Sequence, residues 1–203
     1  MRNPSFSQKQ SIKNDLIRQG RELFARFGLK GASVRELTMA VGIAQGSFYA
    51  FYDAKEELFF DILEQEEIAM ADEIVARLKA GKITRAHLKD VIEWSLEKLR
   101  NNPILRTVLD PVEYKRLWRK IPEERLQNHM QGEKNLLAET VVDLQADGLI
   151  APIDPDVLTG LFHALFVMTL HEDEIGPDLF PKTLDRMIGL VADHVATQGE
   201  RTI

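Results

Sequence analysis

Apolar residues recur at the spacing of an α-helix along nearly the whole chain, and no segment alternates with a period of two over a useful length. Residues 84–101 show this pattern clearly. On one face of the expected helix, at i, i+3, i+4, i+8 and i+11, lie Leu88, Val91, Ile92, Leu96 and Leu99. The sequence therefore predicts an all-α protein.

Glycine, proline and capping residues divide the pattern into separate helices. The expected helices span about residues 11–27, 33–42, 44–51, 55–79, 84–101, 122–147, 155–170 and 179–196, with one or two short helices in 104–121. Ser33 and Glu36 have the spacing of a capping box, in which each side chain accepts a bond from the other residue's backbone N–H. The acidic residues 172–174 are interpreted as a solvated loop.

Two C-terminal helices carry more apolar surface than the core of one subunit requires. The helix at 155–170 is apolar almost all round. The last helix has a single apolar stripe made of Leu184, Met187, Ile188, Val191 and Val195. We expect two such helices from each of two subunits to form a four-helix bundle, and therefore a homodimer.

Residues 33–55 have the pattern of a helix-turn-helix. Gly42 permits the left-handed backbone of the turn, so that two short helices can cross and the second is free to enter the major groove of DNA. The residues expected to be exposed on this second helix are Gln45, Gly46, Ser47 and Tyr49. They offer donors and acceptors for base edges and phosphates and no carboxylate that would repel DNA.

The charge of the chain is unevenly distributed. The formal net charge is -6, which argues weakly against binding to a polyanion. Residues 1–55, however, hold nine Lys or Arg and four Asp or Glu, a net charge of +5, so the remainder carries -11. This asymmetry indicates a basic N-terminal module on an acidic body.

Composition excludes several other classes of protein. The chain has no cysteine, and therefore no disulfide, thiolate nucleophile or sulfur-ligated metal. No apolar run reaches a membrane span of about 18 residues and no signal-like segment is present, so we expect a cytosolic protein. The sequence has no nucleophile elbow, P-loop or dinucleotide fingerprint, and we expect neither an enzyme nor a cofactor. His163 and His171 lack the spacing of ligands on one helix face, so no metal site is expected.

The segment IRQGRELFARFGLKGASVRELTMAVGIAQGSFYAFYDAKEELF, at about residues 17–60, resembles the N-terminal part of the TetR family of bacterial transcriptional regulators, most distinctly in GIAQGSFYAFYDAKEEL. The resemblance implies a three-helix DNA-binding domain at residues 1–55. It further implies a helical effector-binding and dimerisation domain at residues 56–203, and repression that a ligand relieves.

Carried over position by position, the resemblance assigns DNA contacts to seven residues. Base-reading positions fall on Gln45, Gly46 and Ser47, with Arg35 as a further base or phosphate contact. Phosphate contacts fall on Ser33, Tyr49 and Lys55. A structural alternative stays open for Tyr49, which could be a core aromatic of a small domain. Lys55 lies at a helix N-terminus, where its charge and the backbone N–H groups can meet the same anion.

The sequence departs from the family pattern at three positions. Ala44 stands where a Ser or Thr commonly opens the recognition helix, and Tyr52 stands where Phe is usual. Ala54 replaces the usual Ser or Asn, which puts a phosphate contact from that position in doubt. Asp53 is available to cap the following helix instead.

Large apolar side chains mixed with a few polar atoms in the predicted body are typical of a ligand pocket. The candidates for contact with a small-molecule effector, which we expect to be partly apolar, are Trp94, Tyr114, His129, Met130, Phe162 and Phe166. Lys98 and Trp118 are weaker candidates. A packed core or a dimer surface explains the same aromatics equally well.

The leading hypothesis is a ligand-responsive transcriptional regulator, a repressor that binds a near-palindromic double-stranded DNA operator as a homodimer and is released by a small-molecule effector. The alternative is a helical small-molecule-binding or interaction protein whose helix-turn-helix is purely structural. The discriminating features are Gly42, Tyr49, Lys55 and the basic N-terminal segment.

Overall fold

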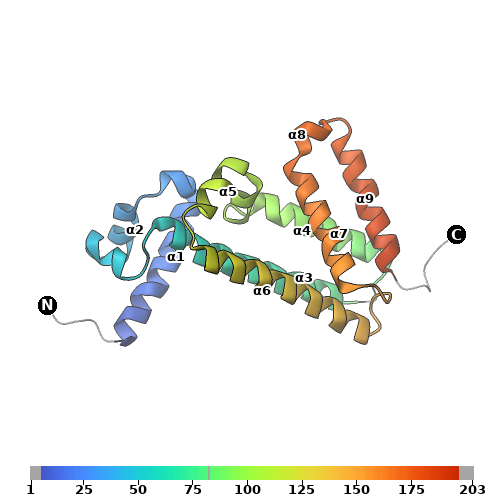
Figure 1. Ribbon diagram of the computed structural model, residues 1–203, viewed down its shortest axis with the longest axis horizontal. Coiled ribbons are helices and arrows are strands. Elements are labelled where there is room, and N and C mark those ends of the chain that lie inside the picture. The colour runs from blue at the N-terminus through green and yellow to red at the C-terminus, as the bar shows by residue number, and fades with distance from the viewer. Residues whose placement is uncertain (1–5, 82, 197–203) are drawn as a thin grey trace. The chain divides into compact units, whose positions relative to one another are not determined.

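Helices make up all the regular structure in residues 6–81 and 83–196, the part of the chain that this computed structural model describes (Figure 1). The prediction of an all-α protein is confirmed. The α-helices are α1 (Phe6–Gly31), α2 (Val34–Val41), α3 (Lys55–Lys79), α4 (Arg85–Asn101), α5 (Pro111–Trp118), α6 (Glu123–Ala146), α7 (Pro155–Leu170), α8 (Glu172–Ile175) and α9 (Phe180–Val195). Two short 3-10 helices are η1 (Gln45–Ala50) and η2 (Leu105–Leu109).

The chain forms two compact units that are each built from two stretches of sequence. The first unit contains the described part of residues 1–68 together with residues 100–126. The second contains residues 69–99 and the described part of residues 127–203. The predicted functional boundary after residue 55 stays a prediction. The helix-turn-helix thus shares a unit with η2, α5 and the first turn of α6.

Capping residues set the ends of the N-terminal helices. Gly28 has a φ of 71°, outside the helical range, and breaks α1 near its end. The Ser33 hydroxyl accepts a bond from the backbone N–H of Glu36, and the Glu36 carboxylate accepts one from the N–H of Ser33, which confirms the predicted capping box. The first core of this unit contains the fully buried Leu16 and Leu37, and an edge-to-face pair of Phe24 and Phe59 with ring centroids 5.1 Å apart.

The second unit has its own hydrophobic core between α4, α6, α7 and α9. Helices α7 and α9 run side by side in opposite directions, joined through α8 (Figure 1). The Asp154 carboxylate caps α7, accepting a bond from the N–H of Asp156. Helix α9 is tied to α4 by an Arg85–Asp193 ion pair and by Lys89, whose Nζ lies 2.5 Å from Asp185 Oδ1.

The expected role of the apolar stripe of α9 in a dimer is wrong, because the chain's own core uses that stripe. Ile188, Val191 and Val195 are almost completely buried, and Leu184 and Met187 pack against the same cluster. A single subunit needs this face to cover α7. The surplus apolar surface lies elsewhere, at Leu190 of α9, which is 52% exposed, and Val157 of α7, which is 50% exposed.

Two further elements differ from the expected ones. Residues 172–174, interpreted as a solvated loop, lie in the single turn of α8. The segment after Gly42 is a 3-10 helix and is shorter than expected. The residue at its N-cap, Ala44, has no polar side-chain atom that could accept a bond from a backbone N–H of the first turn. None of the helices in the described part of the chain is long and apolar enough to cross a bilayer.

Candidate nucleic-acid interface

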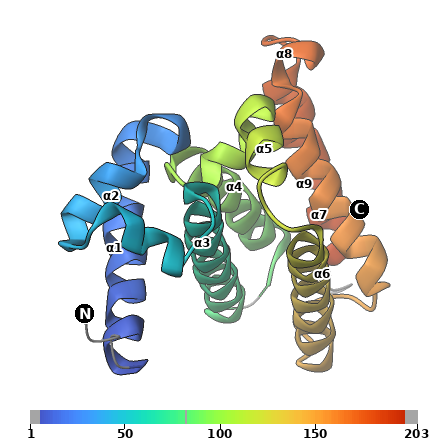
Figure 2. The same cartoon turned by 60° about the vertical axis from the view of Figure 1, so that its left-hand side comes forward.

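A short turn presents η1, the recognition segment, beside α2 (Figure 2). Gly42 closes α2 in the left-handed conformation with a φ of 77°, as its position in the sequence predicts. The N–H of Ile43 then bonds back to the carbonyl of Thr38 at 3.0 Å. Phe48 is fully buried and anchors the recognition segment to the core. The turn and the anchor together hold the other side of the segment in solvent.

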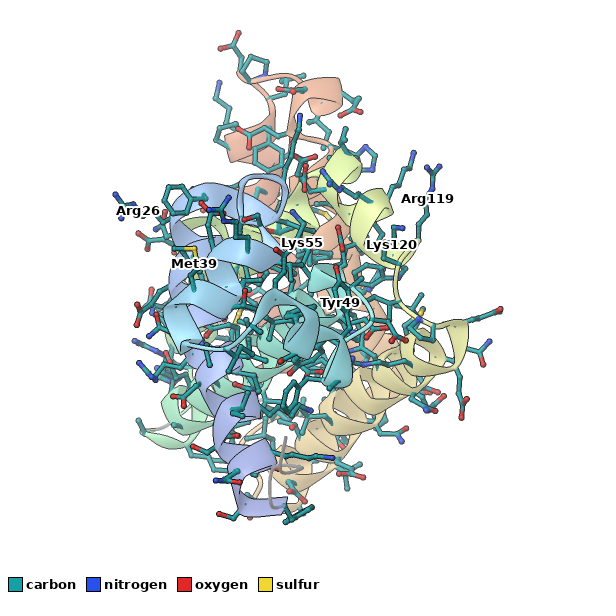
Figure 3. The ribbon with its side chains drawn as sticks, turned by 90° about the vertical axis from the view of Figure 1, so that its left-hand side faces the viewer. Arg26, Met39, Tyr49, Lys55, Arg119 and Lys120 are labelled. Carbon is teal, nitrogen blue, oxygen red and sulfur yellow. The ribbon has the colours of Figure 1, made fainter. Side chains whose placement is uncertain are left out.

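The sequence-predicted contact residues of the recognition segment all lie on the surface. Gln45, Gly46 and Ser47 are exposed, and so is Arg35 on α2. Tyr49 is 56% exposed, with its ring edge-on to Phe48, so the alternative interpretation of Tyr49 as a core aromatic is wrong. The structure therefore brings donors, acceptors and one aromatic ring onto one short exposed element, which Figure 3 views with Tyr49 and Lys55 labelled.

Two of the predicted phosphate contacts also have partners inside the protein. The Ser33 hydroxyl belongs to the capping box and donates to the Glu36 carboxylate at 2.6 Å. The Lys55 ammonium donates to the carbonyl of Ala32 at 2.6 Å and to that of Lys30 at 3.3 Å. Burial lowers the pKa of Lys55. Lys55 thus holds the α1–α2 connection against the start of α3, and its role as a phosphate contact stays a prediction.

The carboxylate of Asp53 does not cap α3 in the way expected. The backbone N–H of Asp53 instead donates to the Glu57 carboxylate at 3.0 Å. Glu57 reaches back to this N–H because it lies one helical turn further along α3. This bond and the Lys55 contacts hold the C-terminal end of the helix-turn-helix against the start of α3.

A cluster of charged residues, which the sequence did not reveal, lies beneath the end of the recognition segment. We call it the Asp61 cluster, and it contains Lys13, Tyr52, Asp61, Glu64 and Arg125. The Tyr52 hydroxyl donates to Asp61 Oδ2 at 2.7 Å, and the Lys13 ammonium lies 3.2 Å from the same oxygen. Arg125 forms an ion pair with Asp61 and a 2.7 Å bond to Glu64 Oε2. The cluster joins α1, the segment between η1 and α3, α3 itself and the first turn of α6.

The protonation states of the cluster follow from these contacts. Burial raises the pKa of the Tyr52 hydroxyl, and its bond to the Asp61 carboxylate raises it further. For Asp61, burial alone would raise the pKa, but the Tyr52 bond and the Arg125 charge outweigh burial and hold the pKa below its ordinary value. Tyr52 is therefore neutral and Asp61 ionised at neutral pH. The hydroxyl of Tyr52, present where phenylalanine is usual in the resembling family, was the signal in the sequence.

The predicted effector contacts are divided between the two units. Tyr114 lies in the first unit and stacks on Trp118 with ring centroids 4.1 Å apart. In the second unit, Trp94 is covered by the Arg77 guanidinium, 3.9 Å from the ring centroid, and Lys98 lies 5.4 Å from the same ring. Phe162 packs against the core of the second unit. The ring centroids of Phe166 and His163 are 6.3 Å apart. Met130 is 60% exposed. His129 is half-buried. Their role stays a prediction.

A groove of about 660 Å³ in the first unit has a different lining. It lies between the Gly28–Lys30 turn and the segment from Pro103 to Glu113. None of the six predicted effector contacts lines it. Across the described residues, no three His, Asp or Glu side chains gather in a way that could hold a metal ion.

A capped helix-turn-helix on an all-helical chain places this protein among the helix-turn-helix folds. Residues 16–62 match the family described as "Bacterial regulatory proteins, tetR family". Among curated proteins, the HTH-type transcriptional repressor AcnR of Corynebacterium diphtheriae is 29% identical over 125 residues, which is 58% of this chain and 64% of AcnR. The match thus spans less than two thirds of that relative's length.

Solved structures resemble the chain over nearly its whole length. A TetR-family transcriptional regulator from Pectobacterium atrosepticum has a TM-score of 0.71 at 16% identity, covering 96% of this chain and 99% of that one. The Thermus thermophilus repressor FadR, in complex with lauroyl-CoA, has a TM-score of 0.58 at 17% identity and covers 94% of this chain and 98% of its own. Residues 16–62 thus match the N-terminal domain of the tetR family of bacterial regulatory proteins, and the chain as a whole has the fold of solved TetR-family regulators.

Proposed function

We propose that this protein is a cytoplasmic transcriptional repressor, not an enzyme, that binds a near-palindromic DNA operator as a homodimer and is released by a small-molecule effector. The observation that carries the proposal is the recognition segment. Its exposed residues supply amide, hydroxyl and phenol groups, and it contains no carboxylate. The match to the tetR family over residues 16–62 supports the same function.

Gly46 adds an argument that does not depend on the family. A Cβ atom placed on Gly46 would meet nothing within 4 Å, and its φ is not in the left-handed range. The fold therefore has no need of glycine at this position. A glycine on an exposed 3-10 turn lets a partner approach the backbone closely, as a DNA groove would.

Gln45→Ala is expected to weaken sequence-specific binding to DNA and to leave non-specific electrostatic binding nearly unchanged. The parent full chain is used to select duplexes from a random-sequence pool, and binding is measured by fluorescence anisotropy on a selected and an unselected duplex. Loss of a base contact should cost about 1–3 kcal/mol on the selected duplex and little on the unselected one. Gln131→Ala, at an exposed position on α6, serves as the matched control.

Equal losses on both duplexes would remove the base-reading role of Gln45. If the parent chain enriched no duplex at all, the helix-turn-helix would be purely structural. The protein would then be a helical small-molecule-binding or interaction protein, the alternative that the sequence left open.

The effector is the second part of the proposal. We place it in the second unit, next to Trp94, His129 and Phe162, because these residues combine ring surface with a few polar atoms. The solved complex of FadR with lauroyl-CoA shows that this fold can hold a partly apolar ligand, and it supplies a probe.

Lauroyl-CoA is expected to bind and to weaken DNA binding by about 1–3 kcal/mol, and by linkage DNA must weaken lauroyl-CoA binding by the same amount. Trp118→Phe leaves Trp94 as the sole tryptophan, so fluorescence reports the second unit. The titration is run with and without the selected duplex. Identical affinities in the two titrations would show that this ligand does not regulate DNA binding.

A further inference from the structure

Helix α5 is packed against the first two turns of α3, close to the recognition segment's end. Arg116 Nε lies 3.9 Å from Glu56 Oε1, and the charges of Arg116 and Glu113 both act on the pKa of Lys55. The rings of Trp118 and Phe60 meet edge to face with centroids 5.9 Å apart. Residues 111–118 therefore lie beside Lys55, one of the predicted phosphate contacts.

The turn that follows α5 holds two exposed cations on an anchored backbone. Arg119 and Lys120 are exposed, while Leu117 before them is fully buried and Ile121 after them is 5% exposed. The N–H of Lys120 bonds to the carbonyl of Leu117 at 2.9 Å. In Figure 3, both side chains project from this turn on the face that also presents Tyr49 and Lys55. Their positions are thus fixed by the core on either side.

Within the described part of the chain, neither of these two charges takes part in an ion pair. Nearby cations are occupied, because Arg116 pairs with Glu56 and Arg125 pairs with Asp61 and Glu64. Among the residues that the structure describes, no carboxylate forms an ion pair with Arg119 or Lys120. Glu123 and Glu124, in the first turn of α6, lie at the positive end of that helix, which favours carboxylates.

We propose that Arg119 and Lys120 contact the phosphate backbone of double-stranded DNA beside the half-site that the recognition segment reads. The proposal rests on the proposed DNA binding and extends the contact surface to a segment about 60 residues further along the chain. Pre-positioned exposed cations that lack internal partners are suited to phosphates, since each contact releases condensed counterions. Contacts of this kind add affinity and no sequence information.

The test uses duplexes of two lengths. The shortest selected duplex that the full chain binds is compared with the same duplex extended by about 8 bp of arbitrary sequence on each side, about three quarters of a helical turn. The parent should bind the extended duplex more tightly and with a steeper dependence on salt. Arg119→Gln/Lys120→Gln should abolish this advantage and reduce the slope of log K against log salt by about 2 per subunit, and each single variant by about 1.

Lys79→Gln/Arg85→Gln is the matched control, because it removes the same number of exposed positive charges from the second unit outside α7 and α9, and the exposed ion pairs of these two residues contribute little to stability. It should keep the parent's dependence on duplex length. If Arg119 and Lys120 only stabilised the C-terminal end of α5, replacing them would change the unfolding midpoint and leave the salt dependence of DNA binding unaltered. A parent-like slope and length dependence in the double variant would overturn this inference alone. A parent chain that binds neither duplex would overturn the proposed function as well.

Discussion

Asp61→Asn is expected to destabilise the first unit by about 2 kcal/mol, because it removes the largely buried carboxylate that accepts charge-assisted hydrogen bonds from its neighbours. Asp61 is the common acceptor for Tyr52, Lys13 and Arg125, and 14% of its side chain is exposed. An amide in its place keeps the shape but loses the charge. Its NH2 group would also face the donors of Arg125.

The measurement is urea unfolding at neutral pH in a Trp94→Phe background, in which Trp118 reports the first unit. Glu64→Gln is the control, since Glu64 also binds Arg125 but 32% of its side chain is exposed. A pair that is this open to water contributes about 1 kcal/mol or less. If both variants lost the same stability, Asp61 would not be the centre of the cluster.

The pH dependence of the same effect follows from the depressed pKa of Asp61. The folded-state pKa lies below the ordinary value of 3.8, so ionised Asp61 stabilises the fold above about pH 4. This contribution disappears as the pH falls through the folded-state pKa. The difference between the parent and Asp61→Asn should therefore be constant near neutrality and shrink below about pH 4.

Val191→Glu is expected to unfold the second unit. Val191 is 4% exposed and belongs to the core that α9 shares with α7. A carboxylate at this position has no partner and must either remain charged in the core or take up a proton, at a cost of about 4 kcal/mol or more at neutral pH. Trp94 fluorescence in a Trp118→Phe background and far-UV circular dichroism would report the loss.

Leu190→Glu, one residue earlier, is the matched variant that tests assembly. Because Leu190 is 52% exposed, its replacement should change the stability of the unit by only about 0.5 kcal/mol. We propose that the exposed sides of α7 and α9 form the dimer interface, so this variant should sediment as a folded monomer. A folded Leu190→Glu dimer would place the interface elsewhere. A folded Val191→Glu would contradict the burial of the stripe.

Local rules predicted the helix-turn-helix well. Ser33, Glu36 and Gly42 act through hydrogen bonds and backbone angles within a few residues, and all three do what their positions predict. The bounds of α3, at Lys55 and Lys79, also follow from local pattern. The recognition segment was harder to predict: it is a six-residue 3-10 helix, and Ala44 before it makes no side-chain cap bond that would mark its start.

The partners of charged side chains could not be read from the sequence. Lys13, Asp61 and Arg125 are separated by 48 and 64 positions, and no local pattern links them. Lys55 was recognised as functional, but its bonds to the Lys30 and Ala32 carbonyls depend on how α3 meets the α1–α2 connection. The division of the six candidate effector contacts between two units is likewise a property of the packing.

The sequence by itself determined the helices, their caps, the helix-turn-helix and the amount of apolar surface to be buried, since these depend on residues close together along the chain. Only the tertiary structure decided which surface is buried against which. An amphipathic stripe such as that of α9 packs equally well on its own subunit or on a second one, and hydrophobic periodicity does not distinguish them. The same holds for charge, because burial and distant partners, as at Asp61, set which side chains remain available for DNA.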